Sequence, residues 1–476
     1  MRESWHLRVR LSVVPLLVLA CSATTAGAQP SPGPTSVTLE SALQYAVDHY
    51  PSVAAAIEQV NASSAEVRVA RSAYLPRLDA VWQSNRATAN NVFGQLLPQS
   101  VIPAMSGPVL PSASASSVWG SAAGALLSWE AIDFGLRAAA VREAEAGEAR
   151  ARSEQTVTRL SVQAAVGSAF LSVLGADQSA LAANADVARR DVLSRAVHTL
   201  AENQLRPGAD VSRADAERAA AQTRAIQARQ AATVARTVLA RTLGLDTAAV
   251  QVEPARLLQS VPVTALAPTR QASTTHPLVQ ASQANVDVLR ARESVLQHTD
   301  RPKLLLQSAL FARGTGANPE GRFDSGVGGL GLERANWAAG VQMVFPNLFD
   351  SASLRARRSA AGALSRAAQS RQKETVLAVS AEQRAAAAAV EAALAIVQNT
   401  PIQVAAARQA EAQARARYDA GLASIVEVAE AQNLLAGAEY QDAMARVDVW
   451  RALLADAVAR GDLAPFIDRV RTAGVP

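Results

Sequence analysis

The sequence has little that would indicate a catalytic or metal site. It holds one cysteine, Cys21, close to the N-terminus, which excludes an intrachain disulfide and a cysteine metal centre from the rest of the chain. Its five histidines are scattered without the spacing of metal ligands. It contains neither a Gly-x-x-x-x-Gly-Lys phosphate loop nor a Ser/His/Asp or Cys/His grouping. We therefore expect no enzyme activity, no cofactor and no metal.

Aromatic residues and long apolar runs are also scarce. Aromatics make up 4% of the 476 residues, and alanine supplies much of the 49% hydrophobic share. Small side chains suit long, closely packed helices better than a thick globular core. The net charge of +5 is small and its charges are mixed along the chain, so nucleic-acid binding is not expected. Beyond the N-terminal segment no apolar run is long enough for a spanning helix, so a membrane crossing would require strands.

The N-terminal segment has the pattern of an export signal. Basic residues precede the apolar run Leu11 to Ala20, and an Ala-x-Ala cleavage site ends at Ala28. This predicts a signal peptide at 1–28 and a Pro/Gly linker at 29–37. An alternative stays open, because the residues before Cys21 resemble a lipobox, and Cys21 would then be lipidated.

The rest of the chain is an internal duplication. Tyr50-Pro51-Ser52-Val53 recurs as His276-Pro277-Leu278-Val279, an offset of 226 (51 to 277). Near the end of each half, Ala209-Asp210-Val211 matches Val426-Glu427-Val428 with an offset of 217 (211 to 428). A constant offset within each stretch predicts two repeats, at 38–262 and 263–463, followed by a tail at 464–476. The change of nine residues places a longer loop in the first half, in the stretch 87–117.

Each repeat contains two segments that alternate like strands. They lie at about 75–86 and 118–130, and at about 304–312 and 335–346. Eleven of the nineteen Trp, Tyr and Phe residues fall in the two windows 74–134 and 304–349, which contain these segments. Aromatic girdles mark the lipid interfaces of membrane barrels, although strands enrich aromatics elsewhere too. The candidate interface residues are Trp82, Trp119, Trp129, Trp337 and Phe345.

The remaining segments are predicted to form long helices. The first half begins with a helix from Leu39 to Ala73, with Thr38 as its N-cap and Ser41 three residues later. After the strands we expect helices that turn near Gly175 and near 384–394. Such helices need neighbours on two sides, as in a coiled-coil wall. A soluble four-helix bundle would leave the paired strands unexplained.

The strand count points to several chains. Four strands cannot close a barrel, and an open edge in lipid leaves backbone groups unpaired. Two chains would give eight strands around a filled interior, whereas three give twelve around an aqueous lumen. The predicted fold class is therefore mainly α with a membrane β-barrel: a helical tunnel plus a twelve-stranded barrel shared by three chains.

The sequence resembles the TolC-type outer membrane factor family. The stretch 416–432 reads Ala-Arg-Tyr-Asp-Ala-Gly-Leu-Ala-Ser-Ile-Val-Glu-Val-Ala-Glu-Ala-Gln and is similar to a pattern at the family's equatorial helix break. Leu127–Gly135 and Phe345–Asp350 resemble the strand-to-helix junctions. The first half departs by placing Gln204 where Gly421 stands. By resemblance, the break residues are Tyr418, Gly421, Glu427, Val428, Gly208, Asp210 and Val211.

The resemblance implies a homotrimer in the outer membrane that reaches into the periplasm and docks on an adaptor protein and an inner-membrane pump. It also implies a gate of polar contacts at the periplasmic end, for which Gln383, Arg384, Glu391 and Asp177 are candidates; an ordinary solvated charge is the alternative for each. Small-molecule efflux is the expected function. Type I protein secretion and a periplasmic coiled-coil adaptor remain alternatives.

Overall fold

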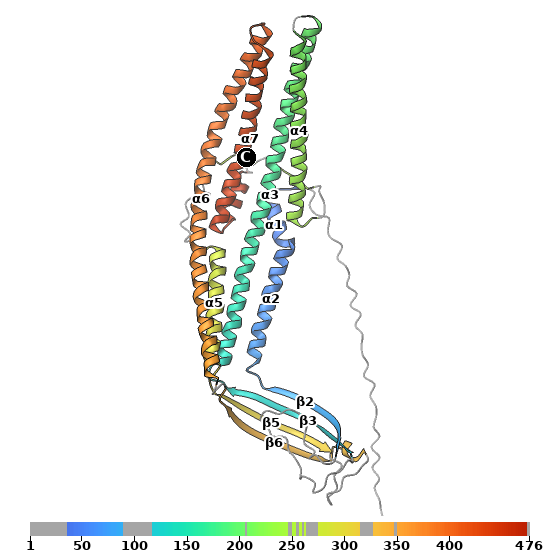
Figure 1. Ribbon diagram of the computed structural model, residues 1–476, viewed down its shortest axis with the longest axis vertical. Helices are drawn as coiled ribbons and strands as arrows, with labels where there is room; N and C mark the ends of the chain where they lie inside the picture. Colours follow the sequence, from blue (N-terminus) through green and yellow to red (C-terminus); the bar gives the residue numbers. More distant parts are fainter. Residues whose placement is uncertain are drawn as a thin grey trace, which may run out of the picture.

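The protein is an elongated molecule with a β-sheet at one end and two helical hairpins at the other (Figure 1). The computed structural model describes residues 36–88, 117–204, 207–245, 250–253, 257–258, 261–262, 275–314, 327–346 and 350–473. The predicted signal peptide with Cys21, most of the loop 87–117, and residues 347–349 of the second junction lie outside the described residues.

The first half begins with two helices instead of one. Strand β1 (Ser36–Val37) leads into α1 (Leu39–His49), and α2 (Pro51–Ser72) follows. Thr38 caps α1, as predicted, and Ser41 completes a reciprocal capping box that was not predicted. The predicted continuous helix is interrupted because Tyr50 is extended (ψ 129°) ahead of Pro51, the first residue of α2.

Two long antiparallel helices complete the first half. After β2 (Arg77–Thr88) and β3 (Ser117–Ile132), α3 (Leu136–Glu202) runs to the far end of the molecule and α4 (Gly208–Leu243) returns to its middle (Figure 1). At ~1.5 Å per residue α3 is ~100 Å long. The short strand β4 (Gln251–Val252) then pairs in parallel with β1.

The second half repeats this path. It contains α5 (Pro277–His298), β5 (Lys303–Gly314), the short 3-10 helix η2 (Val327–Leu330), β6 (Arg334–Val344), α6 (Ser351–Asp419) and α7 (Ile425–Arg460). The predicted C-terminal tail contains a further helix, α8 (Ala464–Ala473). Helices α4 and α7 have 36 residues each and begin 217 positions apart. The offset read from the sequence is thus the offset of the structural repeat.

The helices do not turn near Gly175 and near 384–394, where turns were expected. Helix α3 passes through Gly175 without interruption, and α6 continues through 384–394 and also through Pro401. Gly175 is buried, and a Cβ atom there would meet Arg451 and Met444 of α7. The glycine therefore marks a close approach of two helices, which a sequence pattern does not distinguish from a turn.

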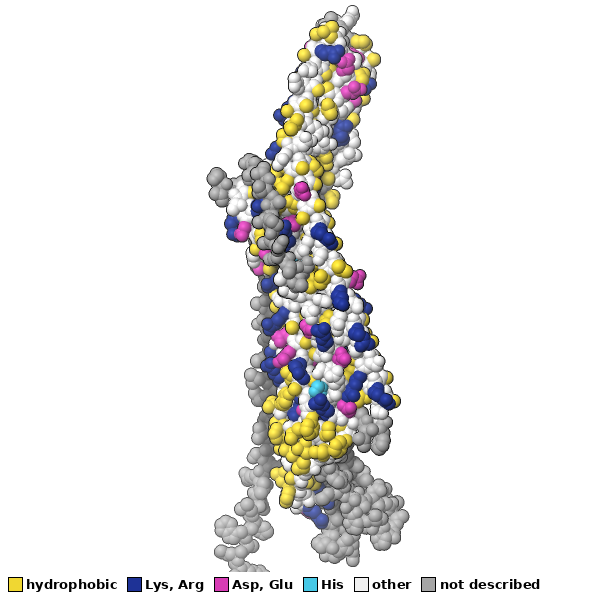
Figure 2. Space-filling view, turned by 90° about the vertical axis from the view of Figure 1, so that its left-hand side faces the viewer, with side chains coloured by type: hydrophobic (Ala, Val, Ile, Leu, Met, Phe, Trp, Pro, Cys, Tyr) yellow, Lys and Arg dark blue, Asp and Glu magenta, His cyan; other side chains and the backbone are white. Residues whose placement is uncertain are grey.

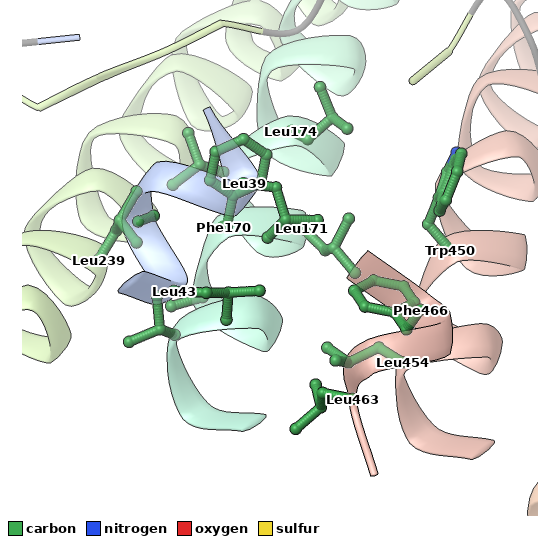
Figure 3. Packing of buried hydrophobic residues seen from close by; sticks show 14 of the residues in the cluster. Leu39, Leu43, Phe170, Leu171, Leu174, Leu239, Trp450, Leu454, Leu463 and Phe466 are labelled. Atoms are coloured by element: carbon green, nitrogen blue, oxygen red, sulfur yellow. The ribbon is translucent and has the colours of Figure 1, made fainter. Parts of the chain in front are cut away.

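The main core lies halfway along the molecule, where α1 and α8 pack across the long helices. Phe170, Leu171 and Leu174 of α3 face Leu39 and Leu43 of α1, with Leu239 of α4 alongside (Figure 3). On the other side, Trp450 of α7 meets Phe466 of α8 edge-to-face, with ring centroids 6.2 Å apart. The Trp450 Nε1 donates to the Leu257 carbonyl oxygen at 2.8 Å. This core fixes the level at which the two repeats join.

Candidate functional site: an open membrane sheet and a helical tip

The four long strands form one antiparallel sheet in the order β2-β3-β5-β6. Strands β3 and β5 join the two repeats, and β2 and β6 are edges without a further partner strand in the described part of this chain. The observed strand bounds agree with the predicted ones to within two residues. The sheet of one chain is therefore open on both sides.

The two faces of the sheet differ in polarity. The residues of the outer face include Leu78, Trp82, Leu127, Trp129, Leu310, Trp337, Val341 and Met343, all exposed. The inner face carries Asp79, Gln83, Ser128, Glu130, Gln307, Asn336 and Gln342, which are only partly exposed. On it, the Lys303 Nζ lies 3.5 Å from the Glu130 Oε2. Figure 2 shows apolar side chains gathered at the sheet end of the molecule.

The predicted interface aromatics lie on the outer face at three levels along the strands. Trp129 and Phe345 are exposed near the helices, whereas Trp82 (75% exposed) and Trp337 (79%) lie farther along the sheet. Trp119, half-buried under the Arg86 guanidinium, is ten residues from Trp129 on the same strand. At ~3.3 Å per residue and the usual ~40° tilt, ten residues span ~25 Å of height, close to the apolar band of outer-membrane barrels.

A buried arginine holds the first strand-to-helix junction. Phe134 and Gly135 turn the chain with positive φ values of 51° and 102°. The Asp133 carboxylate accepts from the Gly135 and Arg137 backbone N–H groups and from the Arg137 side chain. The Arg137 guanidinium also reaches the Ala73 and Ala131 carbonyl oxygens and lies over the Tyr74 ring. This junction lies where the resemblance placed it, between sheet and helices.

The predicted break residues come together, but at the far tip of the helices. Tyr418 is 1% exposed, and its hydroxyl donates to Asp210 at 3.4 Å. Val428 is buried beside it and Val211 packs against the same cluster. Glu427 and Ser424 cap α7 reciprocally, and Gly208 is the first residue of α4. The expected equatorial placement is wrong, because α3 and α6 run unbroken to this tip.

Both helices end at the tip with a left-handed residue. Gly421 has a φ of 77°, and the Leu422 N–H donates to the Arg417 carbonyl oxygen at 2.8 Å. This is the hydrogen bond of a Schellman motif. Gln204, the equivalent residue 217 positions earlier, has a φ of 60°. The break in the first half therefore combines a left-handed Gln204 with Pro207, the N-cap of α4.

The candidate gate residues lie far from this tip. Glu391 is beside the core residues Val390 and Ala393, and 28 residues, ~42 Å of helix, separate it from Asp419. Arg384 is exposed and its Nε donates to the Ser380 carbonyl oxygen; Gln383 is its half-buried neighbour. Asp177 pairs with Arg236 at 2.6 Å. Burial raises the pKa of Asp177, and Arg236 opposes this shift.

A buried ionic cluster lies between the tip and the core, and sequence reasoning missed it. Arg190 of α3 bonds Asp186 at 3.1 Å, Glu217 of α4 at 2.8 Å and Asn433 of α7 at 2.7 Å. Arg224 of α4 also reaches Asp186. The spacing of Asp186 and Arg190 was visible as an i, i+4 pair. Their burial was not, because it depends on α4 and α7.

The neighbouring Arg189 extends this connection to α6. It pairs with Glu439 of α7 at 2.9 Å, and Glu439 also pairs with Arg408 of α6 at 3.4 Å. Together, Asp186, Arg189, Arg190, Glu217, Arg224, Arg408, Asn433 and Glu439 link all four tip helices. We call these eight residues the ionic cluster.

A polar group with the residue types of a hydrolase triad lies closer to the tip, but its geometry is different. Ser194 and His198 of α3 both bond the Asp215 carboxylate of α4, at 2.9 Å and 3.1 Å. The serine therefore does not bond the histidine, as a nucleophile and its base would. Among the described residues no group of three His, Cys, Asp or Glu side chains is arranged to hold a metal.

Helices α3 and α6 each contain a stretch long and apolar enough to cross a membrane by length and composition, and half of the stretch in α3 is buried. Both helices pack lengthwise against other helices, α3 against α4, α5 and α7, and α6 against α5 and α7. We interpret the apolar stretch of α3 as a packing surface, whereas the stretch of α6 is only 28% buried within the single chain.

Comparisons with known proteins agree with this architecture. The chain matches the outer membrane protein VceC of Vibrio cholerae with a TM-score of 0.72, 19% identity and coverage of 89% of this chain and 96% of VceC. The CmeC outer membrane channel of Campylobacter jejuni matches with a TM-score of 0.71 and 15% identity, over 91% of this chain and 89% of CmeC. The open MtrE outer membrane channel of Neisseria gonorrhoeae matches with a TM-score of 0.70 and 18% identity, over 89% of each chain. At these identities the likeness shows the fold.

No curated protein matches the chain by sequence. The model of the outer membrane efflux protein family, however, matches residues 42–245 and 269–455, which are the two halves of the duplication and most of the chain. The chain therefore belongs to the outer membrane efflux protein family.

Proposed function

We propose that this chain is one subunit of a homotrimeric outer-membrane channel. Its helical part would extend into the periplasm and act as a passive conduit for a pump and an adaptor protein. The observation that carries the proposal is the four-stranded sheet, apolar outside, polar inside and open at β2 and β6. Three copies joined edge to edge give twelve strands with every backbone group paired.

The long helices support the same proposal. Helices α3 and α6 begin at the sheet and extend ~100 Å away from it. A wall built of such helices would continue the lumen of the barrel to the far tip. The apolar outer face of the sheet favours this channel over a periplasmic adaptor, whose strands would have no lipid to face.

Single-channel recording in a planar bilayer tests the conduit. Purified protein is expected to form a heat-modifiable oligomer and to insert with discrete conductance steps. A monomer that stays in the aqueous phase would overturn the proposal.

Small-molecule efflux is the transport function that we propose, with type I protein secretion as the alternative. In a strain that lacks the gene, increased sensitivity to toxic small molecules supports efflux. Loss of a secreted protein with unchanged sensitivity supports secretion.

We also propose that the ionic cluster controls the periplasmic entrance. The far tip is the end opposite the sheet (Figure 1), and close to it α3 and α7 connect the two hairpins α3–α4 and α6–α7, as in the hydrogen bond between Arg190 and Asn433. Arg190 is itself buried and bonds both α4 and α7, so a separation of the hairpins would break its hydrogen bond to Asn433 and expose the arginine. The mid-helix candidates Gln383, Arg384, Glu391 and Asp177 lie too far from the tip to join its residues directly.

A further inference from the structure

A glycine-rich segment covers part of the outer face of the sheet. Residues 327–332, Val-Gly-Gly-Leu-Gly-Leu, comprise η2 and the two residues that follow it. The Ser121 hydroxyl of β3 donates to the Gly329 carbonyl oxygen at 2.9 Å, and Ser121 is buried. A Cβ atom on Gly314 of β5 would collide with the Gly331 carbonyl oxygen. The backbone of the segment therefore lies directly on the sheet.

The register of the sheet shows which face is covered. Ser121 and Gly314 are partners across β3 and β5. Ser121 lies two residues from both Trp119 and Ala123, so its side chain shares their face. Ala123 is the partner of Trp82, and Trp82 belongs to the outer face. The segment thus lies on the apolar outside of the sheet, at the end that is distant from the helices.

The aliphatic side chains of this segment point away from the sheet. Val327 is 69% exposed, Leu330 41% and Leu332 45%, while Gly329 beneath them is buried. The six residues carry no charge. Three uncharged aliphatic side chains beside exposed tryptophans make an apolar patch that continues the outer face.

We infer that residues 327–332 form an apolar flap that inserts into the lipid of the outer leaflet. The inference rests on the proposed membrane sheet and adds a lipid contact outside the strands. Lipid is the expected occupant because the flap continues the face that carries Trp82 and Trp337, and because it has no charge for a protein partner to recognise. The glycines allow the backbone to lie close to β3 and β5, which keeps the aliphatic side chains at the lipid surface.

Fluorescence quenching in vesicles tests the flap. Single-cysteine variants Val327→Cys and Leu330→Cys, labelled with a small environment-sensitive dye, are reconstituted as oligomers in phosphatidylcholine vesicles. Quenching by a lipid with a nitroxide near the headgroup is expected to reach at least half that of Val341→Cys on the outer face of β6. Quenching by aqueous iodide is expected to be several-fold weaker than for Leu422→Cys at the far tip, which is 72% exposed.

The controls separate the flap from the membrane sheet itself. Iodide quenching of Val327→Cys equal to that of Leu422→Cys, with Val341→Cys still quenched by lipid, would overturn the flap alone. If iodide quenches Val341→Cys as well, both the membrane sheet and the flap are wrong. In a Ser121→Ala background we expect iodide to reach Leu330→Cys more easily, because the hydrogen bond that docks the flap is gone.

Discussion

At the scale of single residues, the turns of this molecule depend on left-handed positions placed at the repeat offset. Gly244 and Gly461, which end α4 and α7, both have a φ of 77° and lie 217 residues apart. Each packs close to the proline that begins α2 or α5. At the far tip the corresponding positions are Gly421 and Gln204. Backbone conformation has thus been retained in both repeats even where the residue type changed.

Two glycine-to-alanine substitutions near the far tip should change the stability of the protein in opposite directions. At both Gly421 and Gly437 the position that a Cβ atom would occupy has no other atom within 4 Å, so alanine fits sterically. Gly421→Ala is expected to destabilise the tip by ~1 kcal/mol, because alanine disfavours a φ of 77°. Gly437→Ala, inside α7, is expected to stabilise by up to ~1 kcal/mol. Denaturant unfolding followed by helical circular dichroism checks both; equal effects would contradict the strained turn.

Acid should weaken the contact between α8 and α1. The Arg471 side chain hydrogen-bonds Glu40 and lowers its pKa below the usual 4.5. Because the pKa is lowered in the folded state, this contact stabilises fully above the usual value and is lost as the pH falls through the lowered one. Hydrogen-exchange protection of α8, taken relative to the intrinsic exchange rate at each pH, should therefore fall between about pH 5 and pH 3. In Glu40→Gln this loss of protection should be absent; an unchanged profile would exclude the pair as its cause.

At the scale of elements, the ionic cluster links two hairpins whose helix–helix contacts involve few large apolar side chains. Alanine dominates the helix contacts here, as in Ala214, Ala221 and Ala225 of α4. Small contacts allow close approach but bury little apolar area each. We therefore expect the hydrogen bonds of Arg190 to determine, in large part, which residues of α4 and α7 lie against α3.

Removing the central arginine should loosen the tip. Arg190→Ala removes a partner of Asp186 and of Glu217, but Asp186 still pairs with Arg224 and Glu217 is partly exposed, so we expect a cost of ~1–3 kcal/mol. We expect faster proteolysis near 200–210 and larger or longer channel openings in a planar bilayer. Arg195→Ala changes an exposed arginine five residues away, whose ion pair contributes at most ~1 kcal/mol. It should therefore leave both the rate of proteolysis and the channel openings nearly unchanged. Identical behaviour of the two variants would refute control by the cluster.

At the scale of the whole molecule, the two faces of one edge strand should respond oppositely to charge. Val341 is 68% exposed on the outer face, and Gln342, the next residue, faces inward. Val341→Lys is expected to reduce the heat-modifiable oligomer at a cost of up to ~1 kcal/mol, because Val341 lies in the row of Trp129, near the edge of the apolar band. Gln342→Lys should preserve the oligomer, since its side chain would face an aqueous lumen. An equal loss of oligomer in both variants would show that the outer face does not meet lipid.

The alternating strands, the duplication and the N-cap at Thr38 were predictable because each depends on neighbours close in the sequence. A strand shows its two faces every second residue, and a repeat shows its offset directly. For this reason the tryptophans that share one face of the sheet and the residues around the turn at 418–428 could be singled out from the sequence, although their roles stay predictions. Their signals are local patterns that need no knowledge of distant contacts.

The position of the helix turns and of the candidate sites along the long axis of the molecule was not predictable from local sequence patterns. Gly175 and Pro401 resemble helix ends, yet α3 and α6 continue through them because neighbouring helices supply packing along their whole length. For this reason the sequence pattern predicts the break at 418–428 in the middle of the molecule and the gate candidates at its far tip. The structure has the break at the tip and the gate candidates nearer the middle. Arg190 was missed because its partners come from three helices.

The two repeats, the four strands and their apolar faces follow from the order of the amino acids alone, since the period and the offset are visible in the chain itself. Where the helices end in space, which charges are buried and where the segment 327–332 lies depend instead on how the folded chain packs. Those features require contacts between residues far apart in the sequence, such as Arg190 and Asn433, which are 243 positions apart, and no local pattern encodes such contacts.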